Sequence, residues 1–121
     1  AVLGTVVKGS GRGRIMGFPT ANIDPHHEAI PPAGVYAVYV IFEKKRYKGV
    51  LNIGFRPTFN RAEAAEPTIE VHIMSFDRSI YGRDIEVEFV KRLRAEKRFP
   101  SRQKLLKQIT FDEHAARVVL Y

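Results

Sequence analysis

The sequence has 121 residues, 45% of them hydrophobic and 27% charged, which is typical of one globular domain with a single core. No apolar run approaches the length of a membrane-spanning helix, and we find no signal-peptide pattern. Cysteine is absent, which excludes disulfides, thiolate metal sites and a cysteine nucleophile and is compatible with the cytoplasm, where we expect the protein to act. The net charge of +7 favours polyanionic ligands such as nucleic acid, anionic lipid or nucleotides.

The first predicted strand, Val2–Lys8, is rich in β-branched residues and leads into a glycine-rich stretch that ends at Asp24. Glycines let backbone N–H groups turn towards an anion, and arginine side chains suit phosphate. No Gly-Lys-Ser/Thr follows, and a Rossmann pattern would need glycine where Arg14 or Met16 stands, so neither of these phosphate motifs is present. The residues that predict a phosphate loop are Gly9, Gly11, Gly13, Arg12 and Arg14.

The next predicted strand is Thr20–Ile23, after Pro19. In an extended segment Thr20 and Asn22 point to one face, which offers a hydroxyl and an amide oxygen to a hard cation such as Mg²⁺. The alternative is an ordinary turn followed by an ordinary strand, and the pattern alone does not decide between the two.

Three prolines between Asp24 and Gly34 predict a loop. His26 and His27 lie in this loop. We do not expect a metal site there, because adjacent residues converge poorly on one ion and no third ligand is evident.

Val35–Glu43 is the clearest strand of the sequence, and Arg46–Gly54 is predicted to pair with it as a hairpin around a charged turn at Lys44 and Lys45. The segment Phe55–Pro67 that follows is polar and bounded by prolines. We predict a long loop, a candidate lid over a binding site.

Thr68–Phe76 alternates, with Ile69, Val71 and Ile73 on one face and Glu70, His72 and Met74 on the other. If the second face lines a barrel interior, a carboxylate at Glu70 requires a cation or proton chemistry. The alternative is that Glu70 faces solvent. His72 is expected to be a packing residue. A turn at Tyr81-Gly82 precedes the last predicted strand, Ile85–Lys91.

Helices follow the strands. Ser101 is a predicted N-cap, and Thr110 with Glu113 fits a capping box that would start a second short helix. Strands over about residues 2–92 and helices over about residues 101–119, without β-α-β alternation, predict a mainly β fold: one domain over residues 1–121, an antiparallel barrel with a C-terminal α-helical flank.

Several blocks of the sequence carry a resemblance that runs in collinear order over nearly the whole chain. The blocks are Gly4–Gly9, Gly11–Arg14, Gly17–Ile23, Pro32–Tyr36, Asn52–Phe59, Glu70–Ile73, Tyr81–Gly82, Leu93–Phe99 and Ser101, then Gln108, Ile109, Asp112 and Ala115–Arg117. In these blocks the sequence resembles the riboflavin kinase family, which includes separate eukaryotic enzymes and the C-terminal domain of bacterial bifunctional FAD synthetases.

The resemblance implies a six-stranded antiparallel split barrel with Greek-key order and a Mg²⁺-dependent transfer of phosphate from ATP to riboflavin, giving FMN and ADP. It implies that Glu70 is the catalytic base and that Thr20 and Asn22 bind the metal. The glycine loop would form a flap over the ATP phosphates. By the same resemblance Gly9, Gly11, Gly13 and Arg14 belong to this flap, and Arg94, Lys97 and Phe99 contact the flavin.

Ser75 and Arg14 depart from the residues usual in the family, which affects flavin affinity at most. The resemblance also implies an N-terminal adenylyltransferase domain in a full-length protein. Nothing like that domain occurs in this sequence, so we expect the chain to stop at FMN, with neither nucleic acid nor a membrane as partner. Two rivals are a small basic barrel that binds nucleic acid and a passive flavin-binding module.

Overall fold

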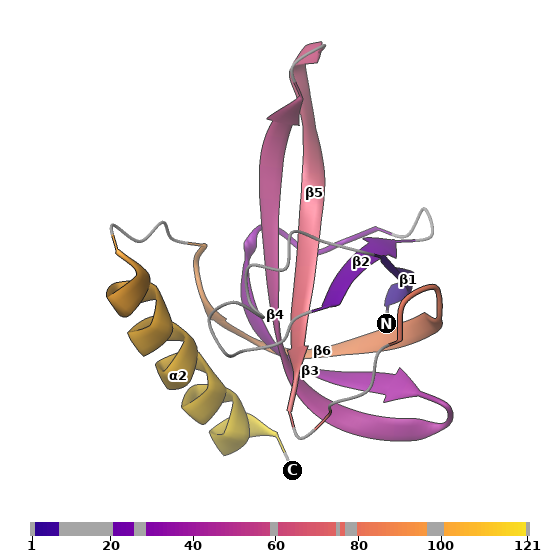
Figure 1. The fold of residues 1–121 in the computed structure, drawn as a ribbon, viewed down its shortest axis with the longest axis vertical. Helices are drawn as coiled ribbons and strands as arrows, with labels where there is room; N and C mark the ends of the chain where they lie inside the picture. The colour runs from indigo at the N-terminus through magenta and orange to yellow at the C-terminus, as the bar shows by residue number, and fades with distance from the viewer. Residues whose placement is uncertain are drawn as a thin grey trace.

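The computed structural model describes residues 2–7, 21–25, 29–58, 61–74, 76, 80–96 and 101–120, with backbone alone at 55–58, 61–67 and 102. Six strands precede one helix in this part of the chain (Figure 1). The strands are β1 (Val2–Val7), β2 (Ala21–Pro25), β3 (Gly34–Phe42), β4 (Lys45–Thr58), β5 (Arg61–Ile73) and β6 (Asp84–Arg94), and the helix is α2 (Arg102–Val119).

The strands form a closed barrel in the order β1-β2-β5-β4-β3-β6, and every neighbouring pair is antiparallel. Strands β3, β4 and β5 are consecutive neighbours, while β2 crosses over to lie beside β5, which is a Greek-key arrangement. The predicted mainly β, six-stranded antiparallel barrel with a C-terminal helical flank is therefore confirmed.

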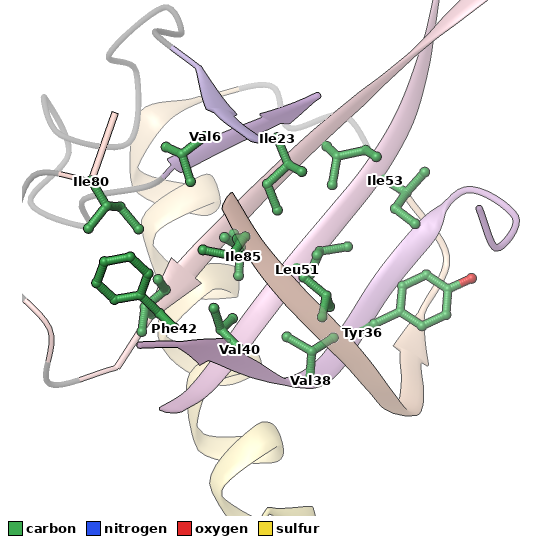
Figure 2. Packing of buried hydrophobic residues seen from close by; sticks show 14 residues of the cluster. Val6, Ile23, Tyr36, Val38, Val40, Phe42, Leu51, Ile53, Ile80 and Ile85 are labelled. Atoms are coloured by element: carbon green, nitrogen blue, oxygen red, sulfur yellow. The ribbon is translucent and has the colours of Figure 1, made fainter. Parts of the chain in front are cut away.

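The barrel interior is filled by alternate residues of each strand (Figure 2). Leu51 and Ile53 on β4 are at most 1% exposed, and they are in register with Val71 and Ile69 on β5. Aromatic rings close the core at its edges, with Tyr36 and Phe89 packed edge to face at 5.2 Å between ring centroids. On β4 and β5 the core thus takes the apolar residues of the alternating pattern and leaves polar residues such as Asn52 and Glu70 outside.

The segment predicted as a long loop is not a loop. Strand β4 continues to Thr58 and β5 already begins at Arg61, so the two strands project from the barrel as a ribbon (Figure 1). Pro57 pairs with Ala65, and Phe55 pairs with Pro67. Each strand of a two-stranded ribbon has a free edge, and proline is tolerated there because that edge needs no N–H donor.

One continuous helix stands where two were predicted. Ser101 caps it as expected, since its Oγ accepts from the backbone N–H of Lys104 at 3.2 Å. Thr110 does not cap a second helix, because its hydroxyl donates to the carbonyl of Leu106 one turn earlier, at 3.0 Å. In the part of the chain that the structure describes, no helix is long and apolar enough to cross a membrane.

Helix α2 covers part of the outer wall of the barrel. Ala116 and Leu120 pack against Ala37 of β3 and Met74, which follows β5. This second, smaller core fixes one end of the helix on the outside of the sheet, where the helix contacts β3, β4 and β6, the last of which carries Arg94.

Candidate functional site

Two of the predicted site residues lie opposite each other on neighbouring strands. Asn22 of β2 is in register with Glu70 of β5, and Glu70 is in turn in register with Asn52 of β4. Opposite residues of an antiparallel pair point to the same face, with Cβ atoms about 5 Å apart. The structure therefore brings an amide, a carboxylate and a second amide together in one Asn22–Glu70–Asn52 row.

This row lies on the outer wall of the barrel, so the reading in which the Glu70 face lines the barrel interior is wrong. The reason is the alternation of β5, where Ile69 and Val71 occupy the core. Glu70 and Asn22 are nevertheless half-buried, and Asn52 is exposed. Glu70 thus faces neither the core nor fully open solvent.

The same row continues around the barrel. Val7 of β1 pairs with Asn22 at one end, and at the other end Asn52 pairs with Val35, which pairs with Arg94 of β6. Three of the predicted site residues that the structure describes, Asn22, Glu70 and Arg94, therefore share one level of the barrel. Three interstrand spacings separate Glu70 from Arg94, or about 14 Å around the wall.

The next outward-facing residue of β5 after Glu70 connects the strand to helix α2. His72 Nε2 lies 3.0 Å from Glu113 Oε2, and Arg117 Nη2 lies 3.3 Å from the other carboxylate oxygen of Glu113. His72 thus contacts a partner on the helix and lies two residues along β5 from Glu70, the predicted catalytic base. This contact sets the position of helix α2 along β5, the strand that carries Glu70.

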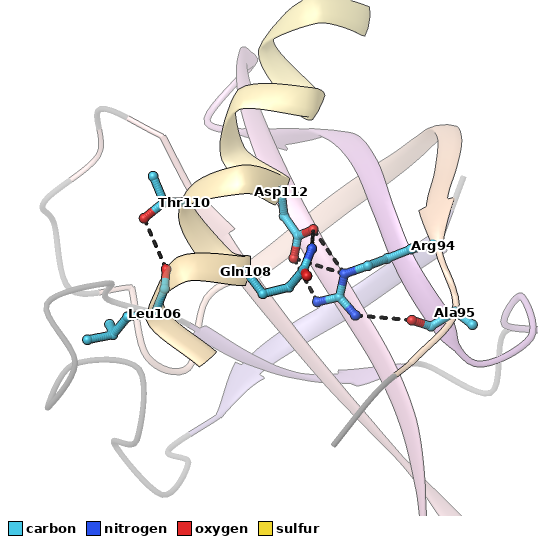
Figure 3. Close-up of polar contacts among 6 residues, drawn as sticks. All are labelled: Arg94, Ala95, Leu106, Gln108, Thr110 and Asp112. Carbon is cyan, nitrogen blue, oxygen red and sulfur yellow. Dashed lines mark hydrogen bonds and ion pairs between the residues drawn. The ribbon is translucent and has the colours of Figure 1, made fainter. Parts of the chain in front are cut away.

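Arg94, predicted to contact flavin, is held by the helix (Figure 3). Its Nε and Nη2 donate to Asp112 Oδ1 and Oδ2 at 2.9 and 2.7 Å. Gln108 Nε2 donates to Oδ1 at 2.9 Å. Asp112 is 4% exposed. The guanidinium is therefore fixed in place, with its Nη1 donating to the carbonyl of Ala95.

A second carboxylate lies on the same outer wall. Gly54 is two residues beyond Asn52 on β4 and pairs with Thr68. A Cβ at Gly54 would meet Glu96 Oε1 and would lie 2.9 Å from its Cδ, so the carboxylate of Glu96 occupies the space that the glycine leaves.

Most of the other predicted site residues lie outside the described part of the chain. These are the phosphate loop with Gly9, Gly11, Gly13 and Arg14, the metal ligand Thr20, and the flavin contacts Lys97 and Phe99. His26 and His27 lie outside it as well. Among the described residues no three His, Cys, Asp or Glu side chains are grouped so as to hold a metal ion.

Sequence reasoning gave no role to Asn52 or Glu96. The sequence did contain a signal for Asn52, because Asn52 is a polar residue between Leu51 and Ile53 in one strand of the predicted hairpin. Glu96 carried no such signal, since its contact with Gly54 joins residues that are 42 positions apart in the chain.

The described site combines groups suited to polar and anionic chemistry. A half-buried carboxylate between two amides can accept a proton from a hydroxyl, and the amide oxygen of Asn22 is a hard donor. The row lies outside the filled core, so a substrate need not enter the core to reach it.

Comparison with known proteins identifies the family of this chain. The family model described as riboflavin kinase matches residues 1–120. The bifunctional riboflavin kinase/FMN adenylyltransferase of Bacillus subtilis is 41% identical over 116 residues, 95% of this chain and 37% of the relative. The protein of that name from Escherichia coli K12 is 42% identical over 118 residues, 97% of this chain and 37% of the relative.

Two further likenesses extend the comparison. The RNA-binding riboflavin kinase RibR of B. subtilis is 41% identical over 111 residues, 92% of this chain and 47% of the relative. A solved structure described as a macrolide-efflux protein from Streptococcus pneumoniae has a TM-score of 0.90 and 34% identity, covering 96% of this chain and 38% of that one. The chain therefore spans less than half the length of each of these relatives.

Proposed function

This chain belongs to the riboflavin kinase family, and from that premise we propose that it transfers the γ-phosphoryl group of ATP to the 5′-hydroxyl of riboflavin. The products are FMN and ADP. The observation that carries the proposal is the register of Asn22 with Glu70 on neighbouring strands. It supports a metal-binding oxygen and a proton acceptor at one point on the outer wall.

In the proposed reaction the 5′-oxygen of riboflavin forms a bond to the γ-phosphorus as the bond from that phosphorus to the β–γ bridging oxygen breaks. Glu70 orients the hydroxyl and takes its proton, and ADP leaves with the bridging oxygen. Phosphoryl transfer needs little covalent help and much positioning, and a carboxylate held on a strand of a rigid barrel supplies positioning.

A divalent metal fits the donor types present, because Asn22 is in register with Glu70 and both side chains carry hard oxygen donors. We assign Mg²⁺ to Asn22 together with Thr20. When bound, Mg²⁺ neutralises charge on the phosphate oxygens. Two neutral oxygens bind Mg²⁺ weakly by themselves, so Asn22 and Thr20 would receive the ion together with ATP.

The other proposed contacts follow the family likeness. Gly9, Gly11, Gly13 and Arg14 would enclose the ATP phosphates, where backbone N–H groups and a guanidinium counter negative charge. Arg94, Lys97 and Phe99 would lie along the flavin. The distance of about 14 Å between Glu70 and Arg94 around the wall supports a substrate whose hydroxyl end and ring end occupy separate positions.

We propose that residues 1–121 act as one kinase domain in the cytoplasm and stop at FMN. Bifunctional relatives carry a second activity in the part of their length that this chain does not match, so an adenylyltransferase domain is a proposed neighbour in a full-length protein. The RNA-binding name belongs to one relative. For this chain we propose that the anion attracted by the net charge of +7 is ATP.

The test is to incubate the purified chain with riboflavin, ATP and Mg²⁺ and to separate the flavins by chromatography. We expect FMN and ADP in equal amounts and no FAD, and no FMN in the reaction without ATP. A chain that binds riboflavin and forms no FMN would support the passive flavin-binding module and overturn the proposal.

A further inference from the structure

The carboxylate of Glu96 lies against Gly54 on the outer wall of the barrel. The Gly54 backbone is not among those with positive φ, so a side chain would be acceptable to the local conformation. What a side chain would displace is the carboxylate of Glu96, which lies against the Gly54 Cα on the outer wall. A carboxylate therefore lies over β4, away from the core.

This carboxylate lies close to the proposed site of reaction. Asn52 is one strand spacing, about 4.8 Å, from Glu70, and Gly54 is two residues further along β4, about 6.6 Å. No side-chain hydrogen bond joins Asn52 or Glu96 to another described residue. Both polar groups are exposed on the wall, with their hydrogen-bonding capacity available to a ligand.

We propose that Asn52 and Glu96 form the subsite for the ribityl chain of riboflavin. The proposal rests on the proposed function, which puts the 5′-hydroxyl at Glu70. The remaining ribityl hydroxyls would then lie over Asn52, about 5 Å from Glu70, and over Gly54, about 8 Å from Glu70. A carboxylate accepts hydrogen bonds from two neighbouring hydroxyls, and an amide both donates and accepts, so the two residues together suit a polyol.

The experiment measures the affinity of the purified chain for two flavins by fluorescence titration, without ATP. Riboflavin carries the ribityl chain, and lumiflavin has the same ring with a methyl group instead. The variants are Glu96→Gln and Asn52→Ala. The control is Glu86→Gln, the same chemical change on β6, with partners on β1 and β3. Because a hydrogen bond to a charged group is lost or weakened, we expect riboflavin to bind about tenfold more weakly to Glu96→Gln and about threefold to tenfold more weakly to Asn52→Ala.

Lumiflavin affinity should stay within about twofold of wild type in both variants, because the ring contacts are untouched. The subsite is wrong if either variant binds riboflavin as tightly as Glu86→Gln, or if either loses lumiflavin affinity to the same extent. Gly54→Ala, which displaces the Glu96 carboxylate, should repeat the Glu96→Gln pattern. Wild type that neither binds riboflavin nor makes FMN would instead overturn the proposed function, so the two failures are distinct.

Discussion

Asp112→Asn probes the contact that holds helix α2 to the end of β6. Asp112 is the only buried charged residue in the described part of the chain, and it accepts from both Arg94 and Gln108. Asparagine has nearly the same shape, but it replaces one acceptor oxygen by a donor and removes the charge. The guanidinium of Arg94 then loses its counter-charge without gaining room to move.

The size of the effect follows from burial. Breaking a fully buried ion pair costs about 3–5 kcal/mol. The Arg94 side chain is 22% exposed against 6% for Asp112, so partial solvation reduces this to about 2–3 kcal/mol. An unfolding entropy of about 2.1 cal/mol/K per residue gives about 0.25 kcal/mol/K for 121 residues. The expected fall in Tm is therefore about 8–12 °C.

Thermal unfolding followed by circular dichroism measures this fall, with Glu88→Gln as the matched control. Glu88 pairs with Arg46 at 3.1 Å, but both side chains are exposed, at 37% and 58%. Such a pair contributes at most about 1 kcal/mol, so the control should melt within about 4 °C of wild type. If Asp112→Asn also melts within that range, the Arg94–Asp112 contact does not hold the helix.

Three further changes test the fold and the site. Leu51→Ala should lower the free energy of unfolding in urea by about 3 kcal/mol, because it leaves a cavity at a fully buried position. A decrease below about 1 kcal/mol would contradict the burial of Leu51 in the barrel core. Thr110→Ala should raise the free energy of unfolding by up to about 0.5 kcal/mol, since Thr110 lies inside one helix. A lower free energy of unfolding would indicate that Thr110 caps a second helix. Asn22→Ala should weaken Mg²⁺–ATP binding by about tenfold in calorimetry and leave riboflavin binding unchanged, and equal nucleotide affinity would remove Asn22 from the metal site.

The sequence predicted the fold where alternation was strong and failed where proline and capping patterns misled. Ile69, Val71 and Ile73 lie in the core as their spacing indicates. Pro57 and Pro67 looked like loop boundaries because proline interrupts a sheet interior, but the free edges of a ribbon accept it. Thr110 looked like a cap because its hydroxyl can serve a helix start or the turn before it, and only packing decides.

The sequence named Asn22, Glu70 and Arg94 as candidate site residues but did not place them relative to one another. Alternation puts Glu70 and Ile69 on opposite faces, but it does not say which face is inside; the closed barrel assigns the larger apolar set to the core. The pairing of Asn22 with Glu70 needs the crossover that sets β2 beside β5. Arg94 meets Asp112 through a helix contact that no local pattern encodes.

The most direct test of the account is Glu70→Gln, measured by riboflavin affinity and by single-turnover formation of FMN. Glutamine keeps the size and the polar contacts of the side chain but cannot accept the hydroxyl proton. We expect riboflavin affinity within about threefold of wild type and a rate of FMN formation lower by about 10²–10⁴-fold. A variant that forms FMN at close to the wild-type rate would show that Glu70 is not the base and would leave the proposed mechanism without its central residue.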